Sequence, residues 1–190
     1  MHLKIRLYFM FIVYSLMFSS SLHPINAYAE TKPLSRDAGK HFFHQSFNDL
    51  ENEIEIAKET GKKGVFIMFN DKNCPWCMKM KKTVLNQVAV QDYYRKHFQL
   101  LIIDTLGDNA MNNFDGNEMT EKDFAFKIHH VRATPVFMFF DTTGKTTMRY
   151  TGTTRTTEEF LWLGEFIVSG KYKKMKFAKY KQEKNNSHRQ

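Results

Sequence analysis

Residues 65–77 read VFIMFNDKNCPWC, and this stretch decides the architecture. Its first five residues form an apolar run that includes two β-branched side chains, which predicts a buried strand. A polar loop follows. A helix is predicted to open at Cys74, because Pro75 then falls at the first helical position, where its missing N–H is not needed. The chain's two cysteines therefore lie three residues apart at a strand-to-helix junction.

The cysteine spacing suits redox chemistry better than crosslinking. Residues three apart at a helix start face one side, with Cα atoms about 5–6 Å apart, which is within disulfide range. At the N-cap, the sulfur of Cys74 would meet unpaired N–H groups and the positive end of the helix dipole, which favour a thiolate. Cys77, one turn further on, would be more buried and would resolve a mixed disulfide. A disulfide closing so short a loop would stabilise the fold by only roughly 2 kcal/mol.

The flanking segments complete a strand–helix–strand unit. Residues 46–60 are predicted to form a helix with Ser46 as its cap. The helix after the cysteines is expected to run to about His97, with a break or bend near residues 86–90. Residues 98–103 (FQLLII) form a second apolar strand. A C-x-x-C pair in this setting is typical of a redox motif.

The C-terminal half alternates helices and strands in the same way. The predicted elements are a helix at 121–130 with Phe124 and Ile128 on one face, a strand from Pro135 to residue 140, a turn at 141–144, a strand at 146–150, and a helix from Thr156 or Thr157 to about Val168. This order predicts an α/β fold with a central mixed sheet flanked by helices.

The CPWC at residues 74–77, followed about 60 residues later by Ala133-Thr134-Pro135, resembles thioredoxin. The resemblance implies a thioredoxin fold with a cis Thr134–Pro135 bond beside the cysteines. It also implies that the protein needs no cofactor or metal, because the cysteine pair itself carries the electrons. The site residues it implies are Cys74 as nucleophile, Cys77 as resolving cysteine, and Pro75, Trp76, Thr134 and Pro135 as substrate-docking residues.

A finer resemblance is to the exported thioredoxin-like proteins of bacterial sulfur-oxidation systems, the SoxW group. It rests on a signal peptide, an N-terminal helix extension, a loop insertion at 105–120 before the Thr-Pro strand, and Gly170-Lys171-Tyr172 with a basic tail. One departure is that thioredoxins carry a buried Asp six residues before the first cysteine, where this chain has Met68. Proton transfer at Cys77 would then use water or a lysine such as Lys79 or Lys82.

The N-terminus is typical of a signal peptide. Lys4 and Arg6 precede an uncharged run at residues 7–18, and Ala27-Tyr28-Ala29 supplies a cleavage signal. An uncleaved anchor is the alternative, but 12 apolar residues are short against the ~20 that span a membrane. Cleavage after Ala29 is expected, with export to a bacterial periplasm. The expected division is a signal peptide at 1–29, a thioredoxin-like domain at 30–180 and a disordered basic tail at 181–190.

Composition fits one globular domain, with 190 residues, 42% of them hydrophobic and 25% charged. The formal net charge of +8 is concentrated at the C-terminus, where residues 171–190 hold eight Lys or Arg and one acid. The core lacks a basic and aromatic patch, which argues against nucleic-acid binding. The tail is expected to be a solvated terminus or to make weak contact with a membrane surface. A monomer is expected, with protein disulfides or dithiols as substrates and a membrane electron donor.

These features predict an exported thiol–disulfide oxidoreductase acting as a reductant. An oxidase or isomerase of exported proteins is the first alternative, since Pro-Trp between the cysteines does not settle the direction. The second is a Cu(I) carrier, because Met78 and Met80 extend the motif to C-x-x-C-M-x-M and soft sulfur ligands suit Cu(I). A zinc site lacks a matching second ligand pair.

Overall fold

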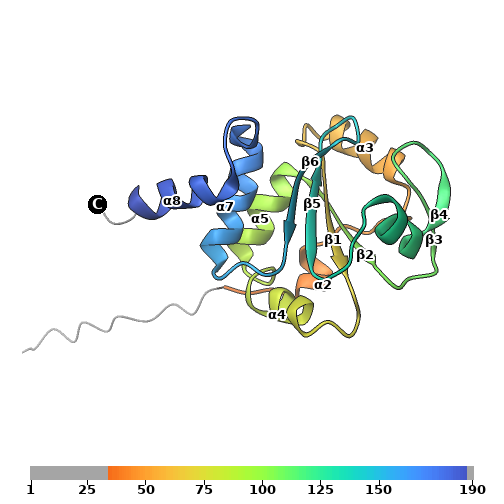
Figure 1. Ribbon diagram of the computed structural model, residues 1–190, viewed down its shortest axis with the longest axis horizontal. Helices are drawn as coiled ribbons and strands as arrows, with labels where there is room; N and C mark the ends of the chain where they lie inside the picture. The colour runs from red at the N-terminus through yellow and green to blue at the C-terminus, as the bar shows by residue number, and fades with distance from the viewer. Residues whose placement is uncertain (1–33, 188–190) are drawn as a thin grey trace, which may run out of the picture. The chain divides into compact units, whose positions relative to one another are not determined.

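A four-stranded mixed sheet forms the centre of the fold (Figure 1). The computed structural model describes residues 34–187, so the expected signal peptide at 1–29 lies outside the described residues. The strand order is β2-β1-β5-β6, and β1 pairs parallel with β2 and antiparallel with β5. The strands are β1 (Val65–Asn70), β2 (Gln99–Asp104), β5 (Val136–Phe140) and β6 (Thr146–Thr151).

Helices cover both faces of the sheet (Figure 1). Helices α5 and α7 lie on one face, and α3 lies on the other, on the same side as the small β3–β4 hairpin. No helix within residues 34–187 is long and apolar enough to cross a membrane. The helical elements are α2 (Ala38–His41), α3 (Leu50–Glu59), α4 (Pro75–Thr83), α5 (Val88–His97), α6 (Glu121–Asp123), the π-helix η1 (Phe124–Ile128), α7 (Thr157–Val168), the 3-10 helix η2 (Lys171–Lys173) and α8 (Phe177–Ser187).

Strand β1 is apolar at every position up to Phe69 because both of its faces are buried. Side chains alternate between the two faces of a strand, and here each face meets its own core. Phe66 and Met68 pack in the cluster that also holds both cysteines, whereas Ile67 and Phe69 pack in the cluster beneath α3. Burial on both faces confirms the predicted strand, and the α/β fold with a central mixed sheet is the one expected.

The helix that precedes β1 starts later than predicted. Helix α3 begins at Leu50, and Asp49 caps it by accepting a hydrogen bond from the N–H of Asn52 at 3.1 Å. The predicted cap, Ser46, instead accepts from the N–H of Asn48, whose φ is 60°. Ser46 therefore shapes the turn that leads into the helix, and the sequence prediction placed the helix cap three residues too early.

The predicted insertion at 105–120 forms a two-stranded hairpin, β3 (Ala110–Asn112) and β4 (Glu118–Thr120). The segment after it contains the π-helix η1, and its i→i+5 bonds include His129 N–H to the Phe124 carbonyl at 3.1 Å. Phe124 is buried, but Ile128, the last residue of η1, is 49% exposed, so the two side chains do not enter the core together as predicted.

The C-terminal segment is helical where a disordered tail was expected from residue 181. Helix α8 runs to Ser187 and packs through Phe177 and Tyr180, both buried. Lys181 pairs with Glu159 at 2.5 Å, and Lys184 pairs with Glu165 at 2.6 Å. These carboxylates on α7 hold part of the lysine run against the domain. The expected boundary at residue 180 therefore falls inside a helix.

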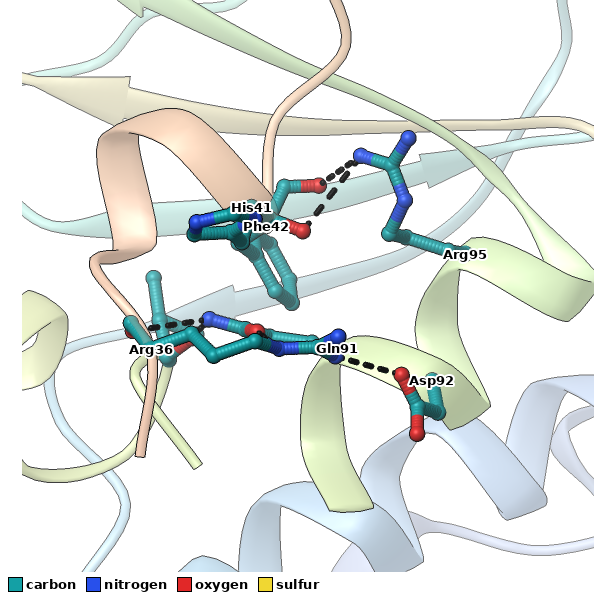
Figure 2. A network of polar contacts seen from close by, with 7 residues as sticks. Arg36, His41, Phe42, Gln91, Asp92 and Arg95 are labelled. Carbon is teal, nitrogen blue, oxygen red and sulfur yellow. Dashed lines mark hydrogen bonds and ion pairs between the residues drawn. The ribbon is translucent and has the colours of Figure 1, made fainter. Parts of the chain in front are cut away.

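The segment before α2 is fastened to α5 by a polar network (Figure 2). Gln91 is fully buried; its amide accepts from Arg36 Nε at 2.8 Å and donates to the carbonyls of Arg36 and Leu85. Arg36 also pairs with Asp92 at 2.5 Å. Arg95 donates to carbonyl oxygens at the C-terminal end of α2. The N-terminal segment and the turn that follows α4 are thus joined through one glutamine.

Candidate active site

The two cysteines lie where β1 ends and α4 begins, as predicted. After β1, the carboxylate of Asp71 accepts from the N–H of Asn73 at 2.7 Å, and its carbonyl accepts from the N–H of Cys74 at 3.1 Å. These bonds turn the chain so that Cys74 becomes the N-cap of α4 and Pro75 its first residue. Both cysteines are free thiols in the structure.

The sulfur of Cys74 lies between the helix start and a loop from the second half of the chain. The backbone N–H of Cys77 donates to Sγ of Cys74 at 3.1 Å, and the Cys74 thiol donates to the Thr134 carbonyl at 3.4 Å. The Thr134–Pro135 bond is cis, as the resemblance implied. The fold therefore brings Thr134 to Cys74 across 60 residues of sequence.

The surroundings of Cys74 favour its thiolate. Burial alone would raise the pKa of Cys74. Hydrogen bonds from the side chains of Cys77 and Thr134, and from the backbone N–H groups of Cys77 and Trp76, outweigh burial and lower that pKa below the ordinary value of a thiol. Cys74 is therefore the more acidic thiol and the more effective nucleophile at neutral pH.

Cys77 has the opposite character. It is completely buried, and burial followed by the hydrogen bond with Cys74 raises its pKa to about 11. The position where thioredoxins carry a buried Asp is here Met68, which is fully buried. Its partners in register are Ile102 on β2 and Phe137 on β5, so the strands offer Cys77 no acidic or basic side chain at this level of the sheet. Cys77 therefore stays protonated until it reacts.

The two lysines considered as proton carriers for Cys77 lie on the outer surface of α4. Lys79 is exposed, and its ammonium lies over the Trp76 ring, 5.6 Å from the centroid. Lys82 is exposed and lines a surface groove. Both side chains are thus directed to solvent rather than into the buried surroundings of Cys77, which leaves water as the remaining candidate.

An arginine that the sequence did not single out holds the loop carrying Thr134. Arg149, on β6, donates to the carbonyl of His129 at 2.5 Å and to that of His130 at 3.4 Å. On the other side, the Pro135 carbonyl accepts from the N–H of Gly152 at 2.9 Å. No local pattern marks Arg149, because its partners are backbone carbonyls some 20 residues away.

The remaining docking candidates differ in exposure. Trp76 is 58% exposed and Pro75 is also exposed, so both form the surface beside Cys74. Pro135 is buried and lies between Thr134 and the start of β5. The structure therefore brings Cys74, Cys77 and Thr134 into contact and leaves Trp76 facing solvent.

The methionines proposed as copper ligands do not lie together. Met78 is 46% exposed, whereas Met80 is 1% exposed and belongs to the core. Within residues 34–187, no cluster of three or more His, Cys, Asp or Glu side chains could hold a metal ion. His129 is half-buried among aromatic rings, and His44 accepts a hydrogen bond from the N–H of Leu100, so these two histidines have contacts within the fold.

Residues 50–167 match the family model of the thioredoxin-like domain, and the chain belongs to this family. It is a thioredoxin-like protein with a close Cys74–Cys77 pair, which is consistent with thiol–disulfide oxidoreductase activity. No curated protein sequence matches the chain.

Solved structures share the fold. A thioredoxin-fold protein from Helicobacter pylori is 24% identical, with a TM-score of 0.61, covering 77% of this chain and 94% of that one. The DsbH oxidoreductase is 14% identical, with a TM-score of 0.51, covering 74% of this chain and 96% of that one. At these identities the likeness is one of fold.

Proposed function

We propose that this protein is an exported thiol–disulfide oxidoreductase that reduces disulfides in other proteins. The observation that carries the proposal is the asymmetry of the cysteine pair. Cys74 is a thiol of lowered pKa at a helix N-terminus, while Cys77 is buried with a pKa of about 11 and donates its N–H to the Cys74 sulfur. Cys74 is therefore suited to attack a disulfide as a thiolate, whereas Cys77 remains protonated until the second step.

The reaction follows from this asymmetry. The Cys74 thiolate attacks one sulfur of a substrate disulfide; that S–S bond breaks, and the second substrate sulfur leaves as a thiolate and takes up a proton. Cys77 then loses its proton to solvent and attacks Sγ of Cys74, which releases the first substrate sulfur as a thiol. The substrate gains two electrons and two protons, and the Cys74–Cys77 disulfide holds the oxidation.

Docking is assigned to the backbone beside Cys74. Thr134 would pair with an extended substrate segment, a mode that reads backbone rather than side chains and so tolerates varied sequences. Pro75 and Trp76 would form the contact surface beside the sulfurs, and the buried Pro135 would help docking by holding Thr134 in place. Trp76 supports this role because more than half of its side chain is exposed next to the nucleophile.

The reductive direction, the periplasmic location and the SoxW-like subgroup rest on the sequence. A reductant in an oxidising compartment needs electrons from elsewhere, so a membrane electron donor belongs to the proposal. Lys173, Lys174, Lys176 and Lys179 are exposed near the C-terminus and support weak contact with an anionic membrane surface. An oxidase or isomerase would use the same two cysteines with the opposite electron flow.

Insulin reduction with two single-cysteine variants tests the proposal. We expect Cys74→Ser to abolish turnover, because the nucleophile is lost. We expect Cys77→Ser to accumulate a mixed disulfide with insulin, visible by mass spectrometry, because the resolving thiol is lost. Wild-type turnover in both variants would exclude the mechanism.

A further inference from the structure

The outward side of α4 carries unpaired positive charge. Three lysines, Lys79, Lys81 and Lys82, follow the cysteines within a single helix of nine residues. Among residues 34–187, none of them has a carboxylate within ion-pair distance, although other lysines of the domain do, such as Lys72 with Asp104. The helix that holds the nucleophile therefore presents a basic surface to solvent.

Two of these lysines line a groove of about 440 Å³. One wall is the segment at residues 35–39, and the other is formed by Met78, Lys81, Lys82 and Asn86. Met78 is 46% exposed there, so the groove combines an apolar contact with two ammonium groups.

The wall opposite the lysines is held in place and contributes one negative charge, that of Asp37. Arg36 is fixed to Gln91 and paired with Asp92 (Figure 2). Asp37 also lines the groove, where its carboxylate accepts from the N–H of Lys40 at 2.8 Å as the cap of α2 and keeps its negative charge. Lys81 and Lys82 together outweigh this single carboxylate, so the charge that meets a ligand is positive.

The groove begins one helical turn beyond the nucleophile on α4. Met78 lies four residues after Cys74, and its N–H donates to the Cys74 carbonyl at 3.1 Å. Lys81 and Lys82 lie three and four residues further on, and residues at these spacings share one helix face. From Cys74 to Lys82 the helix rises about 12 Å, a length that about four residues of extended chain would span.

We propose that this groove binds an acidic segment of the partner polypeptide, with Asp or Glu about two to four residues from the disulfide that Cys74 attacks. The inference rests on the proposed function and adds a substrate preference to it. Opposite charges would steer encounter and fix the direction of the bound segment, and salt would weaken both effects. This surface is separate from the Thr134 backbone, which cannot select a sequence by charge.

The test compares two disulfide-bonded peptides of equal length whose flanking residues are Glu in one and Lys in the other. The reduced protein is mixed with each at low salt and at high salt, and second-order rate constants are measured. A small neutral disulfide, bis(2-hydroxyethyl) disulfide, reports the chemistry alone. We expect the Glu peptide to react about tenfold faster at low salt, with the difference shrinking as salt rises.

The decisive variant is the double substitution Lys81→Glu and Lys82→Glu, matched by Lys63→Glu and Lys145→Glu. The control lysines are exposed and lie where β1 begins and β6 begins, at the end of the sheet away from the cysteines, and the change in net charge is identical. We expect the groove variant to lose or reverse the preference and the control to keep it.

Four results would overturn the inference. Equal rates for the two peptides would show that charge is not read, and loss of the preference in both double variants would assign it to net charge. If the groove variant reacts normally with the neutral disulfide but keeps the preference, the groove is not the binding surface while the proposed function stands. If the wild type reduces no disulfide, both fall.

Discussion

The backbone N–H of Cys77 donates to Sγ of Cys74 across 3.1 Å, so the residue that we propose to resolve the mixed disulfide also stabilises the Cys74 thiolate. The same helix turn buries the Cys77 thiol, which raises its pKa to about 11, while that of Cys74 is lowered. One turn of α4 thus separates two chemically identical groups into two roles.

Alkylation should distinguish the two thiols. We expect Cys74 in the reduced protein to react with iodoacetamide with a midpoint below the ordinary thiol pKa of about 8.5, because hydrogen bonds stabilise its thiolate. Cys77 should stay unmodified until the pH approaches 11. Peptide mapping across a pH series measures both, with the urea-unfolded protein as control. Equal reactivity of the two cysteines would contradict the assigned roles.

Trp76 should matter for partner docking and little for stability. Its side chain is 58% exposed, so Trp76→Ala should change the free energy of unfolding by no more than about 0.5 kcal/mol. Turnover of insulin should fall several-fold, while reaction with a small neutral disulfide should stay unchanged. Phe47→Ala, at a fully exposed aromatic outside α4, is the matched control. A parallel loss with both disulfides would assign Trp76 to the chemistry instead.

Gln91 should be a large contributor to stability among polar side chains. Gln91→Leu would leave the carbonyls of Leu85 and Arg36 without their partner, which should cost about 1–3 kcal/mol. Asp92→Asn, which removes only the exposed pair with Arg36 shown in Figure 2, should cost less than about 1 kcal/mol. Urea unfolding of both variants gives the comparison, and similar losses would mean that the buried amide has no special role.

Stability should fall as the pH drops below neutrality. Burial, and then the charges of Lys62 and Arg95, lower the pKa of His44 from 6.5 to about 4. In the unfolded chain the imidazole binds a proton first, so its contribution to stability is complete above pH 6.5 and is lost as the pH falls toward 4. His44→Asn keeps an acceptor for the N–H of Leu100 but cannot titrate. Urea midpoints at pH 7 and pH 5 should differ less in this variant than in the wild type; an equal difference would rule out His44 as a source.

The local sequence was sufficient to predict those elements whose formation depends on residues close together in the chain. The apolar run that ends at Asn70, the proline after Cys74 and the capping Thr156 act within a few residues, and β1, α4 and α7 form where they were predicted. The cis bond at Pro135 was predicted only through the resemblance, because base rates favour trans.

The features that the sequence did not predict depend on contacts with residues far away in the chain. Ser46 and Asp49 are both good caps three residues apart, and Asp49 prevails where its backbone bridges to Asn112 of the hairpin. Lys181 belongs to a charge run that suggests a solvated tail until Glu159 of α7 is known to face it. Each choice depends on residues too far along the chain for a local pattern to reveal.

The proposed reductive direction is best tested by the reduction potential of the Cys74–Cys77 pair, measured by equilibration with glutathione. We expect a reversible two-electron couple near the thioredoxin value of roughly −270 mV. A value near roughly −120 mV would contradict the reductive direction and indicate an oxidase. Failure to form a Cys74–Cys77 disulfide at any glutathione ratio would contradict thiol–disulfide exchange itself.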